Sequence, residues 1–159
     1  MKVREIMTRD VTTVPPGMTL EDAADMLARR RLRAMPVIDD EGHVLGMLTD
    51  RLLIIRLLPA LERAESGAPA TGSTHAGKVR DIMERAVMCV KEDEPLANVV
   101  RLMLDREIER LPVVREGQLV GFLTRGDIIR RLLLRDTAAE PADESADEAA
   151  DETRETKGE

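Results

Sequence analysis

Aromatic residues are almost absent from this chain: its 159 residues include one Phe and neither Trp nor Tyr. The core must therefore be built from Leu, Ile, Val, Met and Ala, which can pack to normal interior density. The same shortage removes the aromatic platforms on which many proteins stack single-stranded nucleic acid. The composition therefore disfavours a nucleic-acid partner.

Cysteine and long apolar runs are also scarce. The single cysteine, Cys89, cannot form an intramolecular disulfide, and its place in a predicted strand at residues 88–91 favours a buried core thiol over a reactive one. No run approaches the roughly 18 apolar residues that span a bilayer, and the N-terminus lacks the apolar segment of a secretion signal. We expect a cytoplasmic protein with no membrane partner.

Sequence patterns of catalysis are missing as well. The chain has no Ser/His/Asp or Cys/His set, no phosphate-binding or dinucleotide glycine fingerprint, and no convincing metal-ligand spacing. Its two histidines, His43 and His75, lie in a predicted turn and a predicted linker, where surface positions are expected rather than metal ligation. We therefore expect neither an enzyme nor a metal centre.

Negative charge is concentrated at the C-terminal end. The net charge is −7, yet residues 136–159 hold ten acidic and two basic side chains, whereas residues 1–135 hold 22 basic and 21 acidic ones. The segment 136–159 is rich in Ala, Asp and Glu and is predicted to be a disordered tail. The basic cluster "ARRRLR" at residues 28–33 ends a predicted helix, where arginines complement the helix dipole, so it is interpreted as a solvated face.

The chain repeats itself with an offset of 76 residues. "VREIMTRDVTTV" at residues 3–14 matches "VRDIMERAVMCV" at residues 79–90. After a one-residue deletion, the "GMLT" that ends at Thr49 matches the "GFLT" that ends at Thr124. This pattern indicates a duplicated unit of about 55 residues.

The duplication sets the expected domain organisation. We predict a first unit at residues 1–65, a flexible linker at residues 66–77 and a second unit at residues 78–135. A unit of this size buries little surface alone, so the two should share a core.

Each unit has the same predicted element order: strand, helix, strand, strand, helix. The first strand is short and centred on residues 11–14, and the first helix spans residues 19–31 with Thr19 as its N-cap. The corresponding helix of the second unit follows Pro95, and its predicted apolar stripe is Leu96, Val99, Val100, Met103 and Leu104. The fold class is therefore α/β, in its α+β form.

The segment "LTRGDII", which contains Thr124 and Asp127, allows two interpretations. The pattern Thr-x-x-Asp before an apolar helix is a capping box, which requires no ligand. However, a helix start entered through glycines offers free amides to a phosphate, and a nearby carboxylate can accept the hydroxyls of a ribose. Arg110 could add a charge-assisted contact to phosphate.

The duplicated motifs "VREIM", "RLPVV" and "LVGFLTRGDII" resemble those of the cystathionine-β-synthase (CBS) domain pair, or Bateman module, over residues 1–135. The resemblance implies tandem CBS motifs packed as a pseudo-two-fold sandwich, with two clefts that commonly bind adenosine compounds. It implies a main site in which Thr124 contacts phosphate, Asp127 accepts the ribose and Arg110 lies near the phosphate. Further expected members of this site are Phe122 in the cleft wall and Lys2, Met7, Leu32, Arg33 and Ala34 from the first repeat.

The resemblance also implies a second, mirror-related site, with Thr49 from one repeat and Met83, Ile108 and Glu109 from the other. Leu52 stands there in place of the ribose-binding carboxylate. Loss of a charged acceptor for a buried hydroxyl costs about 1.5–3 kcal/mol. We therefore expect one competent site and one weak or empty site.

The expected function is that of a stand-alone CBS pair that senses an adenosine ligand and regulates a separate, unidentified protein, usually as a homodimer. AMP, ADP and ATP are the expected ligands, ahead of S-adenosylmethionine or a dinucleotide, and no cofactor is required. The alternative is a ligand-free dimerisation or protein-interaction module in which Asp127 only caps a helix.

Overall fold

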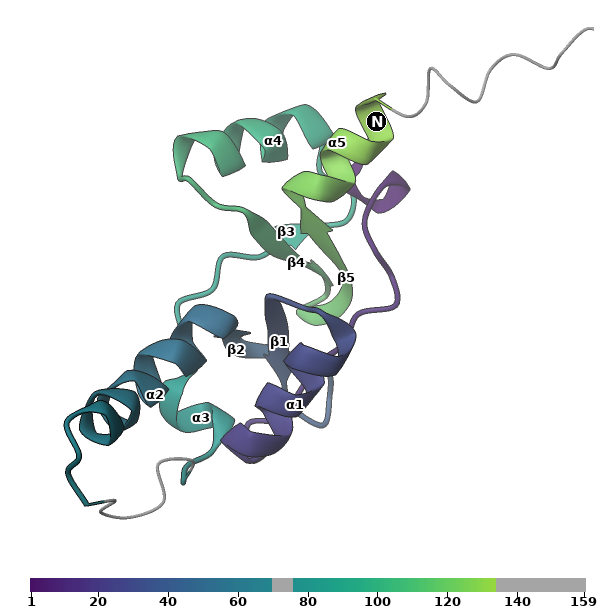
Figure 1. Cartoon of the computed structure of the whole chain (residues 1–159). Helices are drawn as coiled ribbons and strands as arrows, with labels where there is room; N and C mark the ends of the chain where they lie inside the picture. Colours follow the sequence, from purple (N-terminus) through teal and green to yellow (C-terminus); the bar gives the residue numbers. More distant parts are fainter. Residues whose placement is uncertain (70–75, 134–159) are drawn as a thin grey trace, which may run out of the picture.

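The computed structural model describes residues 1–69 and 76–133, in which the two repeats form two similar halves (Figure 1). The remaining residues include His75, the centre of the predicted linker and the whole predicted tail, so those expectations lie outside the described residues. In chain order the elements are η1 (Val3–Glu5), α1 (Leu20–Arg30), β1 (Ala34–Ile38), β2 (Val44–Thr49), α2 (Asp50–Glu65), α3 (Val79–Ile82), β3 (Val90–Lys91), α4 (Leu96–Asp105), β4 (Arg110–Arg115), β5 (Gln118–Thr124) and α5 (Arg125–Leu133).

Each half contains a small sheet covered by helices, which confirms the α+β class. Strands β1 and β2 are antiparallel, as are β4 and β5, and β3 joins β4 in parallel. In the first half the counterpart of β3 is a single parallel bridge between Val14 and Val37. The strand expected at residues 11–14 is therefore reduced to one bridge, since Pro15 and Pro16 follow at once and cannot donate to a ladder.

Local sequence signals set the bounds of α1. The hydroxyl of Thr19 accepts a hydrogen bond from the Asp22 amide at 3.1 Å, which confirms the predicted N-cap. The helix ends at Arg30 because Arg31 adopts a left-handed conformation, with φ of 52°.

The predicted apolar stripe of α4 is only partly confirmed. Leu96, Val99 and Met103 are buried, whereas Leu104 is 65% exposed. The prediction that Leu104 belongs to the stripe was wrong, because the face of α4 that packs on the core is narrower than the set of apolar residues in this helix. Cys89 is half-buried rather than enclosed, and burial raises the pKa of its thiol.

The opening segment of each repeat packs into the core of the other half. Val3 and Met7 are buried against the second half, together with residues such as Leu111. Val79 and Met83 are buried in the first half. Figure 1 shows the purple N-terminal segment running alongside the half that contains α4 and α5. The two halves therefore share their cores through an exchange of these segments.

Backbone hydrogen bonds fix each exchanged segment to the last strand of the other half. Thr8 and Phe122 exchange two N–H···O bonds of 2.9 Å, and Glu84 and Met47 exchange equivalent bonds of 2.8 and 2.9 Å. A glycine adjoins each crossing. A Cβ atom built on Gly46 would lie 2.6 Å from the Glu84 carbonyl oxygen, closer than real side-chain contacts occur.

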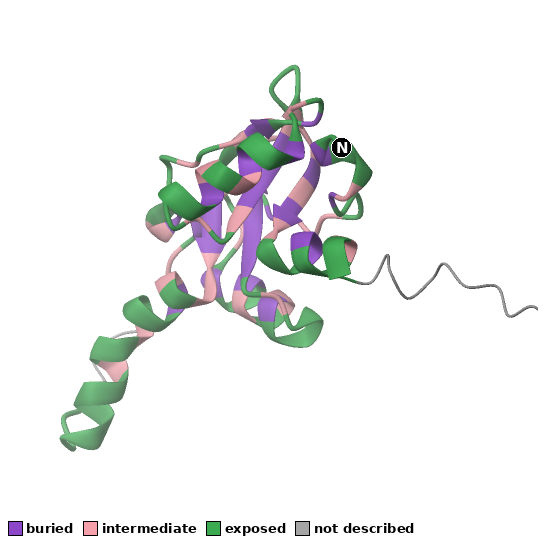
Figure 2. Cartoon of the chain, turned by 90° about the horizontal axis from the view of Figure 1, so that it is seen from above, coloured by how far each residue is buried: buried purple, intermediate pink, exposed green. Residues whose placement is uncertain are grey.

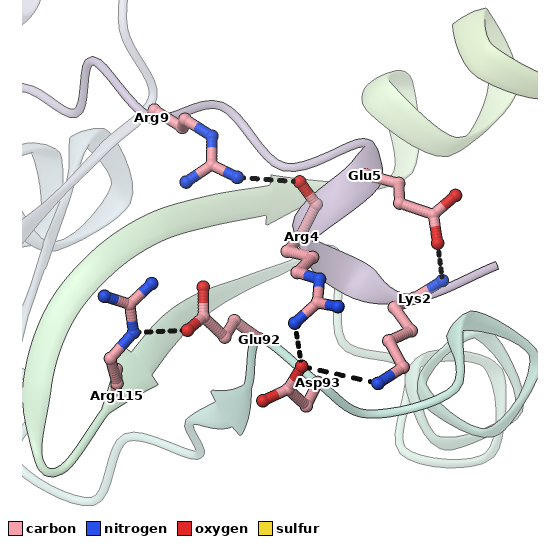
Figure 3. A network of polar contacts seen from close by, with 7 residues as sticks. All are labelled: Lys2, Arg4, Glu5, Arg9, Glu92, Asp93 and Arg115. Atoms are coloured by element: carbon pink, nitrogen blue, oxygen red, sulfur yellow. Dashed lines mark hydrogen bonds and ion pairs between the residues drawn. The ribbon is translucent and has the colours of Figure 1, made fainter.

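Charged side chains reinforce the attachment of the N-terminal segment (Figure 3). Arg4 and Lys2 both pair with Asp93, and the Arg115 guanidinium donates to Glu92, whose side chain is 8% exposed. The backbone amide of Arg4 also donates to the Glu92 carbonyl at 2.9 Å. The hydrogen bond from Arg115 holds the pKa of the Glu92 carboxyl below its usual value of 4.5.

The close approach at Gly46 yields the first prediction. Gly46→Ala should lower the free energy of unfolding by about 1–3 kcal/mol, because the added methyl group meets a backbone oxygen that cannot move aside. Urea unfolding measures the loss. Gly17→Ala is the matched control, since nothing lies within 4 Å of a Cβ atom at that position. Equal losses in both variants would show that the crossing is not tight.

The lowered pKa of Glu92 yields the second prediction. A carboxyl whose pKa falls on folding stabilises the fold above its unfolded pKa, and this stabilisation is lost as the pH falls below about 4.5 through the lower folded value. Glu92→Gln should therefore be less stable than the parent at neutral pH, and the difference should shrink on acidification. Thermal unfolding between about pH 7 and pH 2.5 tests this. Glu62→Gln on α2 is the control, and a pH-independent deficit in Glu92→Gln would contradict the prediction.

Candidate functional site

A cleft of about 480 Å³ lies between the two halves, a volume suited to a small molecule. Its lining residues come from four segments: the end of the N-terminal segment, the turn from α1 into β1, the start of β4, and the end of β5 with the start of α5. They are Thr8, Asp10, Val11, Thr12, Arg31, Leu32, Arg33, Ala34, Pro36, Glu109, Arg110, Phe122, Thr124, Arg125, Gly126 and Asp127. We call this the first cleft.

The start of α5 carries the side chains that the motif analysis singled out. Thr124 donates its hydroxyl to the Asp127 carboxylate at 2.7 Å and accepts from the Asp127 amide at 3.1 Å. The Thr124 amide donates to the same carboxylate oxygen, Oδ2, at 2.9 Å. The capping box is therefore formed, as the sequence predicted.

The cap leaves part of the Asp127 carboxylate uncommitted. Among the residues that the structure describes, Oδ1 has one ion-pair partner, Arg130, at 3.5 Å, and the side chain is 10% exposed where it lines the first cleft. Because Oδ2 makes the cap bonds, Oδ1 can accept a ligand hydroxyl without breaking them. The capping and ligand-binding interpretations of Asp127 are thus compatible.

Strand register holds the rest of the first cleft in place. Arg110 of β4 lies opposite Thr124 of β5, and the Arg125 amide donates to the Glu109 carbonyl at 3.0 Å. The Arg110 guanidinium is paired with the Glu109 carboxylate at 2.9 Å. A phosphate at Arg110 would therefore compete with an existing ion pair.

Seven of the nine residues predicted for the main site line the first cleft: Leu32, Arg33, Ala34, Arg110, Phe122, Thr124 and Asp127. Lys2 and Met7 do not. Met7 is a core residue, 7% exposed, and Lys2 pairs with Asp93. Their placement in the site overlooked the exchange of the opening segment, which brings its end, Thr8 to Thr12, to the cleft instead.

Sequence reasoning missed several residues of the first cleft: Thr8, Asp10, Val11, Thr12, Arg31, Pro36, Glu109, Arg125 and Gly126. Some signals were available. Arg31 precedes the predicted stretch 32–34, and Arg125 and Gly126 lie between two predicted residues. The end of the N-terminal segment carried no such signal, because only tertiary contacts bring it there.

A second cleft of about 560 Å³ occupies the pseudo-equivalent position. It is lined by Met47, Thr49, Arg51, Glu84, Ala86, Val87, Met88, Arg106, Glu107, Ile108, Glu109, Arg110 and Leu111. Thr49, Ile108 and Glu109 are present as predicted, whereas Met83 is a core residue, 8% exposed. Thr49 caps α2 by accepting from the Leu52 amide at 3.2 Å, and Leu52 leaves no carboxylate at the position equivalent to Asp127.

His43 lies closer to carboxylates than the sequence suggested. Its Nδ1 atom is 3.1 Å from Asp39 and 3.4 Å from Glu41, a spacing that could hold a metal ion. The turn itself accounts for the position of Asp39, which accepts from the backbone amides of Glu41 and His43 at 3.0 and 2.8 Å. Those hydrogen bonds, the one from the His43 amide above all, lower the pKa of Asp39.

Similarity to known proteins agrees with this geometry. The family model of the CBS domain matches residues 3–58 and 79–134, which are the two repeats. The chain belongs to the CBS domain family. The resemblance inferred from the motifs is therefore confirmed. Among the helices that the structure describes, none is long and apolar enough to cross a membrane.

The relatives of this CBS pair are diverse. The chain is 32% identical to CBS domain-containing protein CBSX1 of Arabidopsis thaliana, covering 82% of this chain and 64% of that protein. It is 31% identical to inosine-5'-monophosphate dehydrogenase of Methanocaldococcus jannaschii, covering 82% of this chain but 23% of that enzyme. The chain thus spans less than two thirds of the length of these two relatives.

A solved structure resembles the CBS pair over most of its length. The structure of CBSX2, an Arabidopsis thaliana CBS-pair protein, in complex with AMP is 30% identical to the chain, with a TM-score of 0.70. The match covers 85% of this chain and 98% of that one. The fold of the two repeats is thus shared with a nucleotide-binding relative.

Proposed function

We propose that this protein is a regulatory module that binds an adenosine nucleotide in the first cleft and acts on a separate partner protein. The observation that carries the proposal is the position of Asp127, buried beside Thr124 at the cleft with Oδ1 left to accept a ribose hydroxyl. Two hydroxyls of a ribose suit a carboxylate acceptor. The AMP complex of CBSX2 supports the ligand class.

A ligand in the first cleft would contact both halves. Thr124 and Asp127 come from the second repeat, and Leu32 to Ala34 come from the first. Binding therefore favours the packing of the halves in which these segments face each other, and the shift is limited by the difference in affinity between packings. A partner protein that senses this packing would respond to the nucleotide.

Ligand choice and stoichiometry follow from the two clefts. AMP, ADP and ATP are favoured over S-adenosylmethionine or a dinucleotide, and binding requires no metal or other cofactor. The second cleft has Leu52 at the position of Asp127 and therefore lacks the ribose acceptor. We infer one competent site per chain and a regulatory rather than catalytic role, in the cytoplasm.

The module is proposed to act as a homodimer through its exposed apolar helices. On α2, Ile54, Leu58 and Leu61 are between 46% and 64% exposed and recur at helical spacing along one face. Figure 2 shows the exposed end of α2 extending away from the rest of the molecule. Ile129, Leu132 and Leu133 of α5 are also exposed. These faces also support the second candidate function, a ligand-free interaction module.

Thermal unfolding with adenosine ligands tests nucleotide binding. AMP, ADP or ATP at a hundred times its dissociation constant should add about 2.7 kcal/mol of stability. Asp127→Asn should abolish most of this gain, because the amide offers a poorer acceptor to the ribose, while costing about 0.5–1 kcal/mol through the weakened cap.

Asp22→Asn is the matched control, because Asp22 occupies the same position after the N-cap of α1 but lies outside the first cleft. It should remove the same charge from the first turn of a helix and leave the ligand response intact. If no adenosine compound raises the unfolding midpoint of the parent protein, the interaction module becomes the better account of the function.

Sedimentation velocity tests the homodimer. Leu58→Glu places a charge in the centre of the apolar face of α2 and should shift the protein from dimer to monomer at micromolar concentration. Arg63→Glu, near the exposed end of the same helix and on its opposite face by helical periodicity, should leave the dimer intact. A monomeric parent, or a Leu58→Glu variant that remains a dimer, would contradict this interface.

A further inference from the structure

The arginines at the end of α1 fall into two groups. Arg29 donates to Asp25 at 2.8 Å, and Arg30 donates to the Thr12 hydroxyl at 3.1 Å. Arg31 and Arg33 both line the first cleft, and within the described part of the chain neither side chain has a hydrogen bond or ion pair. The cluster that the sequence analysis interpreted as a solvated face therefore places two uncompensated charges at the candidate site.

The backbone explains why these two residues reach the first cleft. Helix α1 ends at Arg30, Arg31 turns the chain with its left-handed φ of 52°, and β1 begins at Ala34. Residues 31–33 therefore form a short connection, and they line the cleft together with Ala34, the first residue of β1.

The other charged groups of the first cleft do not cancel these arginines. Glu109 is paired with Arg110, and Asp127 is held by its helix cap. Arg125 donates through Nε to the neutral Ile108 carbonyl at 3.2 Å, so its charge also remains. The lining carboxylates left to oppose these charges are Asp10, which is exposed, and Asp127, whose Oδ1 lies 3.5 Å from Arg130 outside the cleft lining.

The second cleft carries the opposite charge at the equivalent positions. The 76-residue offset places Glu107 where the first cleft has Arg31, and Glu109 where it has Arg33. Glu107 has a φ of 56°, nearly that of Arg31, so the backbone is preserved while the charge is reversed. The second cleft is lined by three arginines, Arg51, Arg106 and Arg110, and by three carboxylates, Glu84, Glu107 and Glu109, so it has no excess of positive charge.

We propose that the first cleft selects adenosine ligands by the charge of their phosphates, and that Arg31 and Arg33 are the residues that set this preference. Two guanidinium groups without partners among the described residues suit a di- or triphosphate, to which each can donate bidentate hydrogen bonds. The same groups disfavour a cationic S-adenosyl compound. This proposal rests on nucleotide binding in the first cleft and adds the phosphate chain as the feature that is recognised.

Isothermal titration calorimetry of the full chain with adenosine, AMP and ATP tests the proposal. Affinity should rise from adenosine to AMP to ATP, with one strong ATP site per chain and a preference that weakens as salt is added. The double variant Arg31→Gln/Arg33→Gln should lose ATP affinity by about tenfold and should bind adenosine as the parent does. The expected loss is no larger because both arginine side chains are exposed and solvent screens their charges.

A second double variant, Arg29→Gln/Arg101→Gln, changes the net charge equally but alters no residue of the first cleft. It should retain the ATP preference. The proposal is overturned if ATP binds no more tightly than adenosine, if the cleft variant loses both ligands equally, or if the control loses as much ATP affinity. Those results would leave the proposed binding of adenosine compounds intact. If the parent protein binds none of the three ligands, the proposed nucleotide-binding function is itself contradicted.

Discussion

The crossing of each opening segment over the last strand of the other half is the contact on which the remaining structure depends. At both crossings two backbone segments hydrogen-bond directly, and the adjoining strand residue, Gly46 or Gly121, has no Cβ atom to hold them apart. Through these contacts Val3 and Met7 complete one core, and Val79 and Met83 complete the other. Neither half can separate without opening its own core. The walls of both clefts, which come from both halves, are therefore held together by the same exchange.

Local signals in the sequence predicted much of this structure. The duplication, the order of helices and strands, the cap at Thr19 and the capping box at Thr124 all depend on residues close together in the chain. What the sequence did not reveal depends on distant contacts. Met7 has the same apolar character whether it faces a ligand or a core, and only the exchange of segments decides that it is buried. Similarly, nothing in the run of arginines distinguishes Arg30, which contacts Thr12, from Arg31, which lines the first cleft.

The two interpretations of Asp127 describe one arrangement. The cap fixes the carboxylate through two hydrogen bonds from Thr124, and the Asp127 amide donates a third to the Thr124 hydroxyl, so the side chain is already ordered before any ligand arrives. An acceptor that is held in place costs less entropy on binding than a mobile one. The start of α2 uses Thr49, whose hydroxyl accepts from the Leu52 amide, and Asp50, whose carboxylate accepts from the Arg51 amide at 2.7 Å. The carboxylate of α2 thus lies one residue after the N-cap, whereas that of α5 lies three residues after it, where it lines the first cleft.

Duplication gave the chain two similar backbones, but the side chains make the two clefts unlike each other. In the second cleft Leu52 stands where the first cleft has the acceptor Asp127. Glu107 and Glu109 stand there in place of Arg31 and Arg33 of the first cleft. The backbone at Arg31 and Glu107 is left-handed in both repeats, so these differences are chemical rather than conformational. A ligand in the first cleft alone still touches residues of both repeats. Because the halves also share their cores, a ligand bound in that one cleft would be sufficient to bias the packing of the whole pair, and the proposed response would not require nucleotide in the second cleft.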